Sequence, residues 1–187
     1  EKVLADLAGF CRQALADGHT PVLLAYSLGK TQELLRGLAA AQLPVMLTPP
    51  ALKLTRIYEE LGLTFPAHRE FSARAVAGHV VICPPHTTAL LEKIPARRTA
   101  AVTGWALAPG ALYRYRCDAA FPLSDHADFN ELLALVDRVG PRLVYTVHGF
   151  AREFAQILRA RGVEAWALGR ENQLEFGLAA GVPAGLP

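Results

Sequence analysis

The amino-acid sequence predicts an α/β fold with a parallel β-sheet covered by helices on both faces. Four short runs of consecutive apolar residues are separated by segments with helical spacing, and such runs are typical of strands buried on both faces. These runs lie at 21–26, 45–48, 79–83 and 99–103. The chain has 187 residues, 52% of them hydrophobic, which is enough for a core in one large or two small domains.

Helices are expected before and between these strands. Asp17-Gly18 ends the first segment with helical spacing, and Pro49-Pro50 opens a later one with proline in its first turn. Helices are therefore predicted at 2–17, from the turn at 27–31 through about residue 39, from 49 to about 61, and directly after Pro84-Pro85.

The character of the sequence changes near residue 105, where we place a boundary between domains 1–104 and 105–187. Residues 113–116 alternate between tyrosine and arginine, which predicts a half-exposed strand. Asp128 is the expected N-cap of a helix, and the tail from Gly177 is expected to fray. The remaining predicted elements are helices at 128–139 and 150–161 and strands at 142–147 and 163–168.

Composition excludes several classes of protein. No apolar run approaches the roughly 20 residues that a membrane-spanning helix needs, and the N-terminus does not resemble a signal peptide. The three cysteines lack CxxC spacing, which argues against a disulfide framework and a cysteine zinc knuckle. We therefore expect a reducing, cytoplasmic setting. The net charge of +2 does not by itself indicate nucleic acid.

Two histidines stand where predicted strands end and helices begin, which is where α/β proteins keep their chemistry. His126 lies within Ser124-Asp-His-Ala-Asp128, and carboxylates beside an imidazole suit a general acid. The helix that starts after it would offer backbone N–H groups to a phosphate. A histidine that caps the helix or bonds within the loop is the plainer alternative.

His148 precedes Gly149 at the end of the strand predicted at 142–147. Glycine permits a tight turn and the close approach of a ligand, so His148 could point into a site. A hydrogen-bonded structural histidine explains the same pattern equally well. His126 and His148 could converge on one metal or one phosphate, although a zinc site needs three or four ligands per ion.

Three basic residues are candidates for substrate binding. Lys30 follows a strand in a segment that lacks the first glycine of a phosphate loop, so it could meet a phosphate or be a solvated surface lysine. Arg114 and Arg116 would share one face of the predicted strand, where they could hold backbone phosphates. A solvated strand edge protected by charge explains the same alternation.

The two histidine motifs resemble the C-terminal half of the β-CASP nucleases, which belong to the metallo-β-lactamase fold superfamily. The match rests on Ser124-Asp-His-Ala-Asp128 followed by Thr146-Val-His-Gly149, and residues 25–33 resemble the strand-to-helix segment of the inserted β-CASP domain. The closest subgroup is the bacterial exonuclease associated with DNA ligase, with similarity to mRNA 3′-end processing factors. The resemblance implies a β-CASP-like α/β domain at 1–104, followed by closing strands and helices of an αββα metallo-β-lactamase fold at 105–187.

The resemblance also implies a chemistry. In such nucleases two zinc ions hold a hydroxide that attacks a phosphodiester of DNA or RNA, in DNA repair or RNA processing. By resemblance, His148 ligates one zinc ion, His126 contacts the scissile phosphate or protonates the leaving oxygen, and Asp128 orients neighbouring groups. Ser124 joins the three basic residues as a candidate for substrate binding.

The HxHxDH motif of this family, which supplies most zinc ligands, does not occur in the sequence. We therefore expect the C-terminal portion of a longer nuclease, unable to bind zinc tightly or to act alone. Its second domain would expose an apolar face, which we expect an N-terminal segment or a second copy in a homodimer to cover. Nucleic acid, a DNA ligase and a helicase are the partners that the resemblance implies.

Two other functions remain open. The chain could be a non-catalytic module that binds nucleic acid or another protein and lacks the metal site. It could also be a small doubly wound α/β enzyme with a phosphate or nucleotide site at 27–30. Salt-sensitive binding of nucleic acid without cleavage would favour the module.

Overall fold

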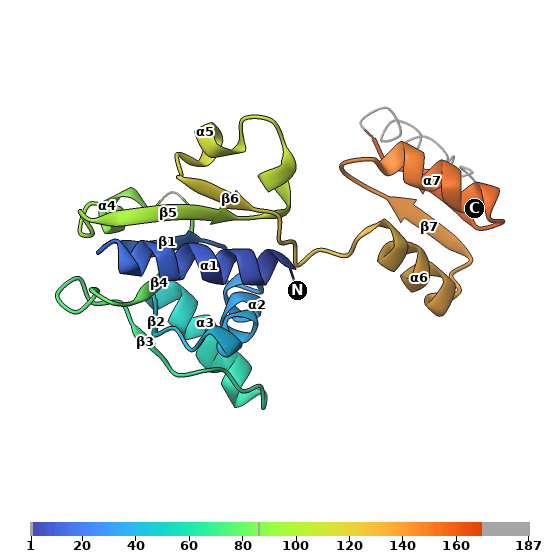
Figure 1. The fold of residues 1–187 in the computed structure, drawn as a ribbon. Coiled ribbons are helices and arrows are strands. Elements are labelled where there is room, and N and C mark those ends of the chain that lie inside the picture. The colour runs from blue at the N-terminus through green and yellow to red at the C-terminus, as the bar shows by residue number, and fades with distance from the viewer. Residues whose placement is uncertain (1, 86, 170–187) are drawn as a thin grey trace, which may run out of the picture. The chain divides into compact units, whose positions relative to one another are not determined.

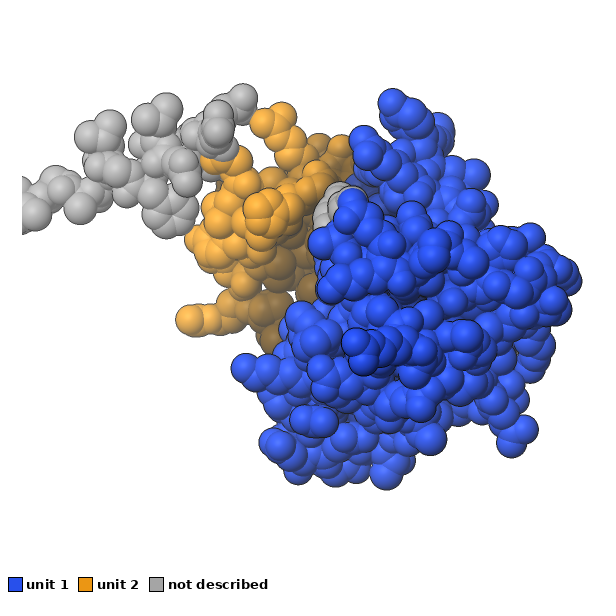
Figure 2. All heavy atoms as spheres, turned by 90° about the vertical axis from the view of Figure 1, so that its left-hand side faces the viewer, with its two compact units in different colours: residues 1–126 blue, residues 127–187 orange. Residues whose placement is uncertain are grey.

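The computed structural model describes residues 2–85 and 87–169 (Figure 1). The chain divides into two compact units, which Figure 2 colours separately: unit 1 is Glu1–His126 and unit 2 is Ala127–Pro187. Among the described residues, no helix combines the length and the apolar character that crossing a bilayer requires.

Unit 1 is built on a six-stranded sheet with the strand order β3-β2-β4-β1-β5-β6. Every pair of neighbouring strands in it is parallel. The prediction of an α/β fold with a parallel sheet is therefore confirmed. The strands are β1 (Thr20–Leu24), β2 (Val45–Leu47), β3 (His68–Glu70), β4 (Val80–Cys83), β5 (Arg97–Val102) and β6 (Ala119–Phe121).

Helices cover both faces of this sheet because successive strand residues point to opposite sides. On one face Leu23 and Ile82 pack with residues of α1, α2 and α3, and on the other Val22 and Val81 pack with Ile94. The central strands are buried throughout, which explains their uninterrupted apolar sequences. The helical elements are α1 (Lys2–Ala16), α2 (Lys30–Gly37), η1 (Ala39–Ala41), α3 (Pro49–Glu60), α4 (Thr88–Leu91), η2 (Gly104–Leu107) and α5 (Ala111–Tyr115).

Unit 2 is a β–α–β arrangement preceded by a helix. Its strands β7 (Leu143–Thr146) and β8 (Glu164–Ala167) pair in parallel, and α7 (Ala151–Ala160) connects them, while α6 (Phe129–Val139) comes first. A small core of Ala155, Leu158 and Ala165 fills one side of the strands. Apolar side chains at alternate positions along the two strands and in the residue directly after each strand are instead exposed: Leu143, Tyr145, Val147, Trp166 and Leu168. What covers this apolar face in the native protein stays a prediction.

Most predicted elements are confirmed within a few residues, but one is wrong. Residues 113–116 belong to helix α5 and its end, because Gly110 and Arg116 adopt left-handed backbone conformations that close a single helical turn. The strands β3 and β6 were missed by the sequence analysis. The tail from Gly177, which is expected to fray, lies outside the described residues.

The compact units meet between residues 126 and 127, later than the domain boundary expected from the sequence. The sheet of unit 1 continues past residue 105 because β6 pairs with β5, with Ala100 opposite Ala119. The compact units are defined by contacts within the structure, whereas the expected domains were defined by the sequence and the family resemblance. The division into domains 1–104 and 105–187 therefore stays a prediction.

Candidate functional site

The segment that carries His126 leaves β6 at the carboxyl edge of the parallel sheet. The strands β1, β5 and β6 are neighbours there, so the loops that follow them emerge at the same edge. Asp118 holds β6 in place because its carboxylate accepts bonds from the backbone N–H (2.7 Å) and the hydroxyl (3.0 Å) of Thr99. The ring of Phe121 also packs edge-to-face on that of Phe10, with ring centroids 5.8 Å apart. The site is thus built on fixed strands.

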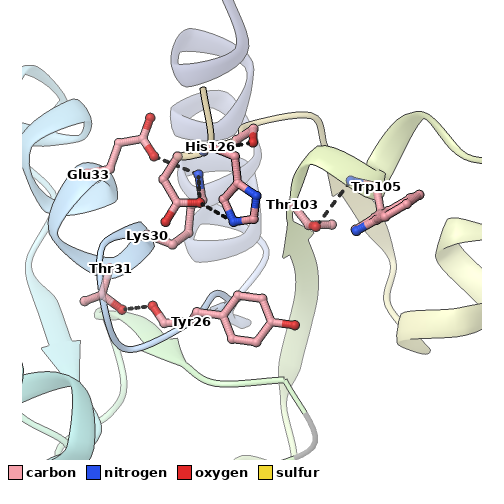
Figure 3. Close-up of polar contacts among 9 residues, drawn as sticks. Tyr26, Lys30, Thr31, Glu33, Thr103, Trp105 and His126 are labelled. Carbon is pink, nitrogen blue, oxygen red and sulfur yellow. Dashed lines mark hydrogen bonds and ion pairs between the residues drawn. The ribbon is translucent and has the colours of Figure 1, made fainter. Parts of the chain in front are cut away.

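Lys30 lies at the start of α2 and is almost completely buried, with 2% of the residue exposed. Its ammonium lies 2.7 Å from Oε2 of Glu33 and 3.3 Å from Oδ1 of Asp125 (Figure 3). An unpaired buried ammonium would cost several kcal/mol, so these carboxylates are what permits a lysine here. The expectation of a solvated surface lysine is therefore wrong, because the buried ammonium is already paired with two carboxylates.

Two glycines let the His126 segment approach the strand-end loops closely. A Cβ atom on Gly29 would lie 2.7 Å from Oδ2 of Asp125, and the backbone of Gly29 is left-handed with φ +75°. A Cβ atom on Gly104 would meet Cβ and Oγ of Ser124 at 3.3 and 3.4 Å. Glycine is the residue that allows both the backbone conformation at 29 and these close approaches.

His126 presents its ring to solvent. Its side chain is 88% exposed, and Nε2 lies 3.9 Å from Oδ1 of Asp125, the same oxygen that faces Lys30. Its backbone N–H donates to the hydroxyl of Ser124 over 3.2 Å. Ser124 therefore shapes the turn before the histidine, and the imidazole is free to contact a ligand.

Asp128 is the N-cap of α6, as predicted, and forms a capping box with Glu131. The Asp128 carboxylate accepts a bond from the backbone N–H of Glu131 (2.9 Å), and the Glu131 carboxylate accepts one from the backbone N–H of Asp128 (2.8 Å). Two carboxylates thus occupy donors at the start of this helix. The predicted phosphate cradle is wrong for these two N–H groups, because they are already bonded to anions.

His148 adopts a left-handed backbone conformation with φ +64°, and Gly149 follows with φ +51°. For a residue other than glycine this conformation costs about 1–2 kcal/mol. The hydroxyl of Thr146 donates to the carbonyl of Ala151 over 2.7 Å and closes the turn between them. Backbone strain of this kind is concentrated at functional sites.

His148 also lines a cavity of about 640 Å³ together with Arg159. His126 and His148 belong to different units, so their convergence on one ligand stays a prediction.

Arg114 and Arg116 line another cavity, of about 500 Å³, although they lie on a helical turn and not on a strand. Both residues are exposed. Arg97, which also lines it, donates to the carbonyls of Leu91 (2.7 Å) and Ile94 (2.8 Å) and is thereby held in place. The left-handed conformation of Arg116 (φ +48°) turns the chain at the end of the helix. The cavity therefore has two arginines available for an anionic ligand.

The described residues do not by themselves fit a zinc ion. Within 2–85 and 87–169, no group of three or more His, Cys, Asp or Glu side chains could hold a metal, whereas zinc needs three or four ligands. Burial raises the pKa of Cys11 and of Cys83 to about 12, so neither supplies a thiolate near neutral pH. A zinc ion held by His148 would need further ligands, which the described residues do not bring together around it.

Comparisons with known proteins agree with the motifs. Residues 114–168, which include both histidines, match the family described as Zn-dependent metallo-hydrolase RNA specificity domain. Over 184 residues, 97% of this chain, the sequence is 58% identical to a protein of Opitutus terrae named "Probable DNA ligase". The chain spans 18% of the length of that relative. The domain matched over residues 114–168 implies a nucleic-acid-related module of the metallo-hydrolase family. The matched domain and the 58% identity to this relative agree with the resemblance of the chain to the β-CASP group of the metallo-β-lactamase fold superfamily.

Proposed function

We propose that the chain forms part of a metal-dependent nuclease that hydrolyses phosphodiester bonds in DNA or RNA. The observation that carries this proposal is the exposed imidazole of His126, on a segment tied to the carboxyl edge of the sheet through Asp125 and Lys30. An exonuclease in DNA repair or RNA 3′-end processing is the specific activity that we propose. The DNA ligase name of the relative from Opitutus terrae favours repair, and the RNA specificity domain favours RNA.

In this proposal His126 contacts the scissile phosphate or donates a proton to the leaving oxygen. Imidazole side chains suit that step because they exchange a proton near neutral pH, and Oδ1 of Asp125 lies 3.9 Å from Nε2 of His126, where the carboxylate can orient the ring. Asp128 supports the segment as the N-cap of α6. His148 contributes one zinc ligand, and because further ligands are needed we assign no step to the metal.

Nucleic-acid binding is supported by exposed aromatic and basic side chains. Tyr26 follows β1 and is 63% exposed, and Trp105 follows the adjacent β5 and is 67% exposed (Figure 3). Aromatic rings of this kind stack on the bases of single strands. Arg114 and Arg116 could hold backbone phosphates at their cavity.

Fluorescence anisotropy with labelled single-stranded DNA and RNA tests this binding. The double variant Arg114→Gln/Arg116→Gln should weaken binding. It should also make the negative slope of log association constant against log salt concentration shallower by about 1.4, or about 0.7 for each lost phosphate contact. Arg74→Gln changes one exposed arginine outside the cavity and serves as the control. An unchanged slope in the double variant would remove the two arginines from the proposed interface.

Hydrolysis is tested in the native protein that carries this sequence. His126→Gln should lower kcat on a labelled oligonucleotide by about 10²- to 10⁴-fold, the usual contribution of a general acid, while the oligonucleotide still binds. Full kcat in this variant would refute the proposed role of His126.

A non-catalytic nucleic-acid-binding module is the second candidate. The observation that favours it is that the described residues gather no metal-binding cluster. If the native protein, supplied with zinc, binds oligonucleotides in a salt-sensitive manner without cleaving them, the module is the better account.

A further inference from the structure

Lys30 joins two parts of unit 1 that are far apart in the sequence. It begins α2, directly after the loop that follows β1, and Asp125 lies in the segment after β6. The ammonium of Lys30 lies 3.3 Å from Oδ1 of Asp125, with 3% of the lysine side chain exposed. The lysine end of the ion pair is therefore shielded from water, and the lower dielectric constant there strengthens the attraction between the two charges.

The partners of Lys30 differ in what they connect. Glu33 belongs to the same helix, and its contact at 2.7 Å is an ordinary pair three residues apart. Asp125 instead precedes His126 directly, so holding Asp125 restricts where the backbone of His126 can lie. Both carboxylates are about one-third exposed, so water can solvate them without the lysine.

A second observation points to the same contact. Gly29 has no side chain at the position where a Cβ atom would lie 2.7 Å from Oδ2 of Asp125. Two consecutive residues at the start of α2 thus accommodate one carboxylate, Gly29 by leaving room for it and Lys30 by charge. A lysine that served only to begin the helix would not require this space.

We propose that Lys30 is a positioning residue that fixes Asp125 and thereby the backbone of His126 at the carboxyl edge of the sheet. Its relevance to catalysis rests on the proposed role of His126. Lys30 does not touch the substrate in this arrangement, because its ammonium is buried against the two carboxylates. Loss of Lys30 should therefore lower kcat in the native protein and leave KM almost unchanged.

Backbone ¹⁵N relaxation of the 187-residue chain tests the positioning without any need for activity. In Lys30→Met the order parameters of the Asp125 and His126 amides should fall from about 0.85, typical of rigid backbone, to below about 0.6. Glu33→Gln keeps the Asp125 contact and should leave them unchanged, and Lys30→Arg should restore much of the order. Unchanged order in Lys30→Met, or an equal loss in Glu33→Gln, would overturn the inference.

A steric variant tests the same contact if Lys30→Met does not fold. Gly29→Ala keeps the lysine but places a Cβ atom against Asp125, so it should also lower the order of the His126 amide. Gly18→Ala is the matched control, because Gly18 has almost the same φ (+74°) and no atom within 4 Å of the added Cβ. Equal order at His126 in both alanine variants would count against the inference. Full kcat in His126→Gln would refute the proposed catalytic role of His126 alone and leave the positioning by Lys30 intact.

Discussion

Substitutions of Asp128 separate its role as a helix cap from a role in catalysis. Asp128→Ala removes the acceptor of the 2.9 Å bond from the Glu131 backbone N–H and a negative charge at the helix N-terminus. Loss of an N-cap costs about 1 kcal/mol, within a range of about 0.5–2. The charge contributes about a further 0.3 kcal/mol, since Asp128 is exposed. Asp128→Asn keeps an acceptor and should cost only a few tenths of a kcal/mol.

Hydrogen exchange along α6 measures these differences where they arise. Because 1.4 kcal/mol corresponds to a factor of ten in an equilibrium constant, Asp128→Ala should speed exchange in the first turn of α6 by about five- to tenfold. Asp128→Asn should speed it by less than about twofold. Asp137→Ala, in the same helix but away from its start, should not affect the first turn, because it loses only a surface ion pair with Arg161.

A catalytic role of Asp128 would show as a difference between kcat and hydrogen exchange in Asp128→Asn. In the native protein this variant would then lower kcat, although hydrogen exchange shows that the start of α6 remains stable. If Asp128→Asn speeds exchange as much as Asp128→Ala, charge and not the hydrogen bond holds the helix start. If Asp128→Ala has no effect on exchange, the capping box does not stabilise α6 and the reasoning fails.

Three further outcomes are expected. Burial raises the pKa of Cys11 and Cys83 to about 12 from 9.0, so the unfolded chain loses these protons first as pH rises. The free energy of unfolding should fall between pH 9 and 12 by up to about 1.4 kcal/mol per pH unit for each thiol. Denaturant titrations should show a shallower fall for Cys83→Ala, and an equal fall would contradict the burial argument. His148→Val should be less stable than His148→Gly by about 1 kcal/mol or more in thermal melts, because a branched side chain resists a φ of +64°, and equal melting temperatures would show that the turn carries no strain. Light scattering should show self-association of the chain that Val147→Lys reduces, because Val147 is 54% exposed on the apolar face of unit 2, whereas a monomer at high concentration would argue against a homodimer.

The sequence predicted the central strands well because strands buried on both faces consist of consecutive apolar residues. The buried strands β1 and β4 read TPVLL and VVIC, and no knowledge of neighbouring strands is needed to recognise them. The edge strand β3 reads HRE and is mostly exposed, so only its pairing with β2 makes it a strand. For β6, three half-buried residues gave too short a signal.

The helix α5 was predicted as a strand because tyrosine and arginine alternate there. Alternation over four residues is compatible with either structure, and the left-handed residues at its ends decide between them. Gly110 could have indicated a turn before the segment, since glycine favours this conformation. Arg116 carries no such signal, because arginine rarely has a positive φ.

The sequence predicted the candidate site in part. His126 was found because a histidine between two aspartates at a strand end is a local pattern. The contact between Lys30 and Asp125 was not found, because it depends on β1, β5 and β6 being neighbours in the sheet. The one available signal was Gly29 before Lys30, a position where glycine permits a close approach.

The two aspartates that flank His126 have different partners in the structure. Both carboxylates were considered as partners of the imidazole, since each lies within two residues of it. Asp128 is bonded to the Glu131 backbone in the capping box, whereas Asp125 lies 3.9 Å from Nε2 of His126 and 3.3 Å from the Lys30 ammonium. Asp125 is thus the carboxylate available to orient the histidine, and Asp128 stabilises the helix that follows. Asp125→Asn should therefore disturb His126 more than Asp128→Asn does, and a comparison of the His126 ring resonances in the two variants decides the point.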